Sequence, residues 1–280
     1  MLPASGRENS LDHDSSITSG PNSHPKIVAV ANQKGGVGKT TSVINLGACL
    51  AAVGKKTLIV DLDPQCNATS GLGFETAENP SILELLLGES QQFSPSKHGD
   101  IEPLSILTGS PDLVGAEKLI AESEDSVRAV TRLLHGLLSV SEDGYDYIFL
   151  DCPPSLNLLT LNALTAATHL LVPVQAEYYA LEGLAAIMES LEFTREHTNP
   201  NIELLGLAIT MVDVRTNLAA QVESEIRKHY GDRVFRTTIP RNVRLSEAPS
   251  HGLPIILYDI YSRGAKAYME LTKEILNHGT

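Results

Sequence analysis

A glycine-rich stretch that directly follows an apolar strand constrains this chain more than any other feature of its sequence. The apolar run Ile27–Asn32 leads into residues 33–41 (QKGGVGKTT), and a helix-forming segment, Thr40–Val53, continues from them. In an open parallel sheet, the loop between a strand and its helix lies where ligands bind. Glycines let successive N–H groups surround an anion, and the helix N-terminus adds partial positive charge. This order of elements predicts a phosphate-binding loop.

Two lysines and a threonine give this loop its expected chemistry. Following the pattern G-x-x-x-x-G-K-[ST], we expect Lys39 to reach the β- and γ-phosphates and the Thr40 hydroxyl to ligate Mg²⁺. The usual first glycine is replaced by Gln33, and a second lysine, Lys34, stands five positions before Lys39. The predicted phosphate-binding residues are Lys34, Gly35, Gly36, Val37, Gly38, Lys39, Thr40 and Thr41.

Aspartates end two further strands of the predicted sheet. Asp61 ends the run Thr57–Asp61, and Asp63 follows two positions later, so both carboxylates face the same side. The apolar run 147–151 ends in Asp151. An acid at the end of such a strand is typical of the Mg²⁺ site of nucleotide-binding sheets. Without a cation, carboxylates gathered at one sheet end would repel each other. These acids therefore predict a magnesium site beside the loop.

Short apolar runs alternate with helical segments from Lys26 onward. The strands are expected at 27–32, 57–61, 104–107, 147–151, 169–174 and 204–212, and the helices at 40–53, 81–87, 112–122, 126–140, 156–167, 181–197, 217–230 and 262–277. Continuously apolar strands are typical of a parallel sheet covered on both faces. We predict an α/β fold with a doubly wound, mostly parallel sheet, as a single domain over residues 26–280. Residues 1–25, polar and serine-rich, are expected to form a disordered tail.

Composition excludes several classes of protein. Hydrophobic residues make up 42% of the chain, enough for a sizeable core, and the net charge of −13 argues against a generally basic nucleic-acid coat protein. No apolar run approaches the ~20 residues that span a bilayer. The N-terminus lacks the apolar stretch of a signal peptide, and the three cysteines are widely spaced. We therefore expect a cytoplasmic protein without disulfides.

Residues 34–40 (KGGVGKT) resemble the deviant Walker A motif of the ParA/MinD group of P-loop ATPases, and residues 61–67 and 151–155 resemble its switch regions. The resemblance implies an ATP-bound sandwich homodimer in which Lys34 contacts the phosphates held by the other subunit. It also implies that Asp63 orients or activates the attacking water. Mg²⁺ would contact Asp61 and Asp151 through its water shell. Cys66 replaces the glycine expected there, with little consequence because it is small.

Two segments near the C-terminus, residues 210–217 and 239–250, narrow this resemblance to the ParA/Soj branch. It implies a chromosome- or plasmid-partition ATPase with ATP and Mg²⁺ as cofactors. The dimer would associate with the nucleoid until a ParB-type centromere-binding partner stimulates hydrolysis. By the same resemblance, Pro240 and Asn242 would line the adenine pocket.

Two arginines, Arg215 and Arg244, match positions that this branch uses to bind double-stranded DNA without sequence preference. Charge supports this independently, since residues 213–244 hold seven basic and four acidic residues in an acidic chain. A local basic patch suits weak, salt-sensitive contact with DNA phosphates.

Three other functions stay open. A MinD-like positioning ATPase of membranes or large assemblies would attach to a membrane through an amphipathic helix with a basic polar face. In the C-terminal helix, the lysines at 266 and 273 are balanced by the glutamates at 270 and 274, which argues against such attachment. We therefore expect no membrane partner. A redox protein like the nitrogenase iron protein would need paired cysteines, which the sequence does not match. A repressor that uses ATP only as a conformational ligand would have no use for Asp63.

Overall fold

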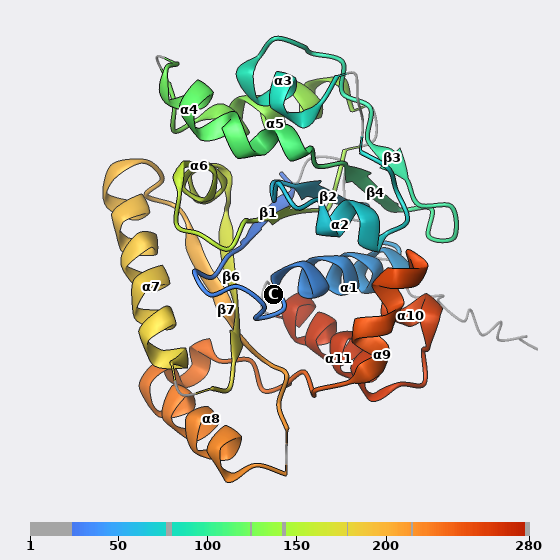
Figure 1. Cartoon of the computed structure of the whole chain (residues 1–280), viewed down its shortest axis with the longest axis vertical. Coiled ribbons are helices and arrows are strands. Elements are labelled where there is room, and N and C mark those ends of the chain that lie inside the picture. Colours follow the sequence, from blue (N-terminus) through green and yellow to red (C-terminus); the bar gives the residue numbers. More distant parts are fainter. Residues whose placement is uncertain are drawn as a thin grey trace, which may run out of the picture.

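A seven-stranded sheet forms the centre of the fold in the computed structural model, with strand order β3-β4-β2-β5-β1-β6-β7 (Figure 1). The structure describes residues 24–76, 80–123, 125–141, 144–177, 179–213 and 215–277. The tail predicted over residues 1–25 lies outside this range except for its last two residues.

Neighbouring strands run parallel throughout the sheet, apart from the pair β3 and β4. The strands are β1 (Lys26–Val30), β2 (Thr57–Asp61), β3 (Ser96–Lys97), β4 (Leu104–Leu107), β5 (Tyr147–Asp151), β6 (His169–Gln175) and β7 (Glu203–Thr210). Strand β1 lies between β5 and β6, and β5 lies between β1 and β2. The glycine-rich loop and the strand-end aspartates therefore meet at the carboxyl edge of the sheet.

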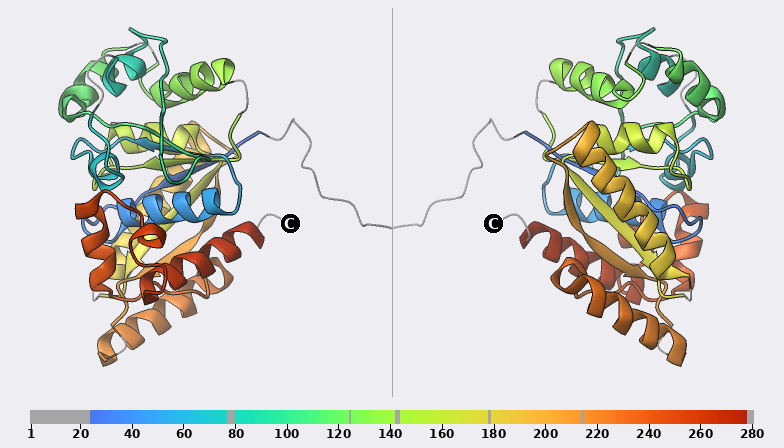
Figure 2. Two further views of the ribbon diagram at one scale, coloured as in Figure 1. Left: turned by 90° about the vertical axis from the view of Figure 1, so that its right-hand side faces the viewer. Right: turned by 90° about the vertical axis from the view of Figure 1, so that its left-hand side faces the viewer.

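Helices cover both faces of the sheet, as the two side views in Figure 2 show. One hydrophobic core packs against α3 (Ile82–Leu87), α4 (Ala116–Ala121), α5 (Ala129–Val140), α6 (Leu158–Ala166), α7 (Ala180–His197) and α8 (Asn217–Tyr230). The other packs against α1 (Lys39–Ala52), α2 (Asn67–Gly71), α9 (Val243–Glu247), α10 (Ile255–Tyr258) and α11 (Arg263–Asn277). Cores on both faces explain why consecutive strand residues are apolar.

The fold class predicted from the sequence is confirmed, and the six expected strands lie within two residues of their predicted bounds. The helix expected over residues 112–122 is instead a 3₁₀ turn, Pro111–Gly115, followed by α4. Elements β3, α2, α9 and α10 were not expected. Each has two to five residues, which is too short for a hydrophobic period to appear.

Helix α11 closes the fold by docking its apolar side into the core. Tyr268 and Leu271 are fully buried, and the Tyr268 hydroxyl lies 3.1 Å from the Ser42 hydroxyl on α1. Within the described part of the chain, no helix has the length and apolar character needed to cross a bilayer.

Two glycine turns touch backbone to backbone on the α1 face. Gly73 lies just after α2, Gly252 lies just after the 3₁₀ turn Ala248–His251, and both have positive φ, 77° and 65°. A Cβ added at Gly252 would lie 2.6 Å from the Gly73 Cα, closer than real Cβ atoms come. The contact therefore ties α2 to the segment that follows α9.

We expect Gly252→Ala to lower the free energy of unfolding by about 3 kcal/mol, from left-handed strain and a backbone clash together. Gly54→Ala is the matched control, because Gly54 also has positive φ, 85°, but nothing within 4 Å of an added Cβ. It should cost only about 1 kcal/mol. Urea unfolding of both variants measures the difference. Equal losses would show that the contact of the two turns does not constrain the fold.

Candidate functional site

The loop between β1 and α1 has the backbone of an anion-binding loop. Gly36 and Gly38 have φ of 74° and 90°, a conformation that residues with side chains rarely adopt. Gly38 is the N-cap of α1, and no side chain of the described residues caps this helix. The amide groups of its first turn, Lys39–Thr41, are therefore available to an anion.

Lys39 places a buried ammonium group beside the strand-end acids. Its side chain is only 6% exposed, and its Nζ donates to the Lys34 carbonyl at 3.4 Å. Burial lowers the pKa of Lys39, while the negative charge of Asp151 and, more weakly, that of Asp63 raise it. Lys39 is thus held between the loop backbone and the carboxylates, as a phosphate ligand of this loop would be.

Asp61 is fully buried, and neighbouring donors hold its carboxylate firmly. Oδ2 accepts from the Thr69 amide at 2.9 Å and from the Thr69 hydroxyl at 2.7 Å, and Oδ1 accepts from the Asp63 amide at 3.2 Å. Burial raises the pKa of Asp61 to about 6, against the lowering effect of these hydrogen bonds. The Thr69 hydroxyl also accepts from the Gly109 amide at 2.9 Å. Asp61 therefore anchors α2 to the sheet, a role that sequence reasoning missed.

Asp63 lies in the loop after β2 and is 6% exposed. Its Oδ1 accepts from the Gln65 amide at 3.0 Å, which fixes the carboxylate near the end of the strand. Its negative charge raises the pKa of both Lys39 and Asp151. The structure therefore brings Lys39, Asp63 and Asp151, three of the residues predicted around the phosphates, close together.

Asp151 is fully buried, and its carboxylate has no completed hydrogen bond among the described residues. It pairs in register with Asp61 across β2 and β5. Burial raises the pKa of Asp151 well above its usual value, the negative charge of Asp61 adds to this, and the nearby Thr40 hydroxyl opposes it. An acid with a raised pKa costs stability when ionised. The cost is therefore full above the folded-state pKa and disappears as pH falls toward about 4.

A cation would remove this cost, and the donors present suit Mg²⁺. Carboxylate and hydroxyl oxygens are its preferred ligands, and Mg²⁺ usually completes its shell with waters and substrate phosphates. Among the described residues, no three His, Cys, Asp or Glu side chains form a metal cage. The residues thus fit an ion held by Thr40 and, through water, by Asp61 and Asp151, with phosphates supplying further ligands.

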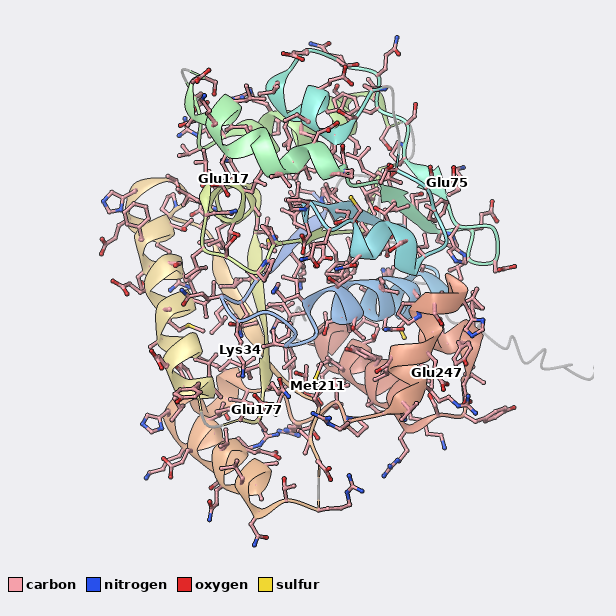
Figure 3. The ribbon with its side chains drawn as sticks, viewed as in Figure 1. Lys34, Glu75, Glu117, Glu177, Met211 and Glu247 are labelled. Atoms are coloured by element: carbon pink, nitrogen blue, oxygen red, sulfur yellow. The ribbon has the colours of Figure 1, made fainter. Side chains whose placement is uncertain are left out.

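A cavity of about 500 Å³ adjoins the loop where the base of a nucleotide would lie. Its lining includes Pro240 and Asn242, the two residues predicted to line an adenine pocket, together with Thr41, Met211 and Tyr268. Met211 has φ 53°, left-handed for a residue with a side chain, and lies at the centre of the view in Figure 3. Sequence reasoning quoted the motif that contains Met211 but did not assign it to the site.

Cys66 adopts a left-handed backbone, φ 53°, at the N-cap of α2. From the sequence, replacing glycine here was expected to matter little, but this conformation favours glycine and a side chain strains it. Burial raises the pKa of the thiol to about 11, and the charges of Asp61 and Asp63 add to the effect. The Cys66 thiol therefore stays protonated beside the acids.

The side chain of Lys34 pairs with an acid from another loop. Its Nζ lies 2.6 Å from Oε2 of Glu177, in the turn between β6 and α7 (Figure 3). Nothing in the sequence motifs pointed to Glu177.

The two arginines predicted to bind DNA are exposed, and each has acidic partners. The Arg215 side chain is 83% exposed and pairs with Asp213 at 2.6 Å. The Arg244 side chain is 54% exposed and pairs with Glu247 at 2.9 Å and with Asp259 at 3.5 Å. The Arg215 pair is bidentate, with Nε 2.8 Å from Oδ1 and Nη2 2.6 Å from Oδ2 of Asp213, so a phosphate group must displace both contacts to bind this arginine.

Known proteins resemble this chain over most of its length. A family model described as an AAA domain matches residues 25–204. The sporulation initiation inhibitor protein Soj of Bacillus subtilis is 49% identical over 91% of this chain and 99% of its own. The chromosome partitioning protein ParA of Caulobacter vibrioides is 43% identical over 90% of this chain and 94% of its own.

Solved structures agree with these relatives. A Mycobacterium smegmatis protein titled cobyrinic acid a,c-diamide synthase, crystallised with ADP and magnesium, superposes with a TM-score of 0.77 at 35% identity. The superposition covers 91% of this chain and 95% of the other. The same protein was also crystallised with an ATP analogue and magnesium. This chain therefore belongs to the ParA/Soj family of chromosome-partitioning P-loop ATPases, with ATP and Mg²⁺ as its cofactors.

Proposed function

We propose that this protein is a DNA-segregation ATPase that forms an ATP-bound sandwich dimer, binds DNA without sequence preference, and is released by hydrolysis. The observation that carries the proposal is the cluster of Lys39, Asp63 and Asp151 at the N-terminus of α1, where no described side chain caps the helix. A buried acid without hydrogen-bond partners is costly unless a charged ligand arrives, which suits a site that waits for a nucleotide.

Within one subunit, the first-turn amides of α1 and the Lys39 ammonium group would bind the β- and γ-phosphates. Thr40 and, through water, Asp61 and Asp151 would hold Mg²⁺, which would neutralise phosphate charge when bound. Asp63 would orient the water that attacks the γ-phosphate in line. The cavity beside Pro240 and Asn242 would take the adenine base.

Between subunits, Lys34 would contact the phosphates held by the partner. Its side chain is 37% exposed, so a second copy of the chain could reach it. A lysine that contributes only across the interface would make the closed dimer depend on ATP. Hydrolysis would remove the γ-phosphate and thereby weaken the dimer.

Arg215 and Arg244 would bind DNA phosphates in place of their acidic partners. A dimer presents two such surfaces, and effective concentration makes two weak patches bind more strongly than one. A ParB-type centromere-binding protein would stimulate hydrolysis and release the dimer, which would otherwise stay on the nucleoid in the cytoplasm.

Helix α11 favours this function over a MinD-like one. Its apolar side is buried in the core, and on its surface Lys273 Nζ lies 2.7 Å from Glu270 Oε1. A helix docked in this way presents no apolar face to a lipid surface.

We expect Asp63→Ala to bind ATP and accumulate as a dimer while hydrolysing ATP at least about a hundredfold more slowly, because the residue acts only on the attacking water. Phosphate release and sedimentation velocity on the same samples measure both properties. Asp112→Ala, an exposed acid in the turn Pro111–Gly115, is the control and should behave as wild type. Hydrolysis by Asp63→Ala at the wild-type rate would contradict the assigned role.

We expect Arg215→Ala combined with Arg244→Glu to abolish binding to random-sequence duplex DNA while ATP binding and dimerisation persist. Wild type should bind DNA with ATP but little with ADP, and its affinity should fall steeply with salt as phosphate contacts release counterions. Mobility shifts at two salt concentrations measure this. Arg132→Ala is the control, since Arg132 on α5 is also an exposed arginine paired with an acid. DNA binding by the double variant, or binding indifferent to nucleotide, would refute the proposed surface.

A further inference from the structure

Lys34 and Glu177 form an ion pair that joins two loops far apart in the sequence. Lys34 Nζ lies 2.6 Å from Glu177 Oε2, and the other carboxylate oxygen, Oε1, accepts from Gln175 Nε2 at 2.5 Å. Both oxygens of Glu177 are therefore held, one by the lysine and one by Gln175 at the end of strand β6.

The backbone around this pair is also fixed on both sides. The Glu177 amide donates to the Gln175 carbonyl at 2.8 Å, and the Ala180 amide donates to the Glu177 carbonyl at 2.9 Å. On the other side, Asn32 Oδ1 accepts from the Lys34 amide at 3.0 Å, while Asn32 Nδ2 donates to the Pro173 carbonyl at 2.8 Å. The glycine-rich loop and the end of β6 thus form one hydrogen-bonded unit that aims the lysine at the glutamate.

We propose that Glu177 is a positioning residue that holds Lys34 on its own subunit until an ATP-bound partner offers its phosphates in exchange. The inference rests on the proposed function, in which Lys34 reaches across the dimer. The Lys34 ammonium group lies 2.6 Å from the Glu177 carboxylate and must leave it to bind phosphates on the partner. The pair therefore opposes dimerisation, because each lysine must leave its glutamate to reach the partner's phosphates.

The exchange is reversible because the pair is weak. Both side chains are more than a third exposed, at 37% and 46%, and exposed ion pairs of this kind change an equilibrium by about threefold. A triphosphate carries several negative charges and attracts the lysine more strongly than one carboxylate does. Since a symmetric dimer breaks two pairs, removing the Glu177 charge should favour dimerisation by about tenfold.

The test is Glu177→Gln, examined with the slowly hydrolysed ATP analogue AMPPNP and Mg²⁺ by sedimentation equilibrium on the full chain. We expect the protein concentration at half dimerisation to fall about tenfold relative to wild type. Glu196→Gln, which removes an exposed charge from the far end of α7, is the control and should leave it unchanged. In a Lys34→Ala background, Glu177→Gln should have no effect, because the lysine that it restrains is absent.

Weaker or unchanged dimerisation of Glu177→Gln would overturn the proposal, as would an equal gain in the Lys34→Ala background. The proposed function is tested separately by wild type in the same experiment. If wild type does not dimerise with AMPPNP, the dimer itself is refuted and the role of Glu177 falls with it. If wild type dimerises and the variants do not differ, only the role of Glu177 is refuted.

Discussion

The rest of the site depends on a pair of buried carboxylates, Asp61 and Asp151, that end adjacent parallel strands directly opposite each other. Parallel pairing in register forces the two charges together, and burial makes ionisation of both costly. The two carboxylates differ in their hydrogen-bond partners. Thr69 satisfies Asp61, whereas Asp151 has no hydrogen-bond partner among the described residues and faces the buried Lys39. We propose that this unsatisfied carboxylate prepares the site for a cation and a phosphate.

The same cluster connects the site to the rest of the α1 face. Asp61 holds the beginning of α2 through Thr69, and the end of α2 meets the Gly252 turn through Gly73. That turn follows α9, the helix that carries Arg244. A movement of the loop around Asp63 would thus be transmitted through packed backbone toward the proposed DNA-binding surface. We propose that this contiguity couples nucleotide state to DNA affinity.

Patterns that repeat along the chain predicted the fold and the phosphate loop, because consecutive apolar residues and a Gly-Lys-Thr sequence are local signals. Contacts between distant residues were beyond the sequence. Thr69 and Glu177 carry no motif of their own, and only folding brings them to Asp61 and Lys34. Backbone angles were also beyond the sequence. The small size of Cys66 suggested that it could replace glycine without consequence, whereas its φ of 53° shows a strained backbone. Local motifs can be predicted from one sequence, but the hydrogen-bond and ion-pair partners of their side chains and the backbone angles require the structure.

The central claim is that Asp151 is an acid left unsatisfied for a Mg²⁺-bound nucleotide, and thermal unfolding of Asp151→Asn tests it most directly. The substitution removes one of the two aspartates whose charge acts on Lys39 and keeps the shape of the side chain. Without nucleotide, the variant should unfold at a temperature no lower than that of wild type. Mg²⁺ added to ATP should raise the unfolding temperature of wild type but not of the variant. A variant that is several degrees less stable without nucleotide, yet keeps the full Mg²⁺ increment, would contradict the account.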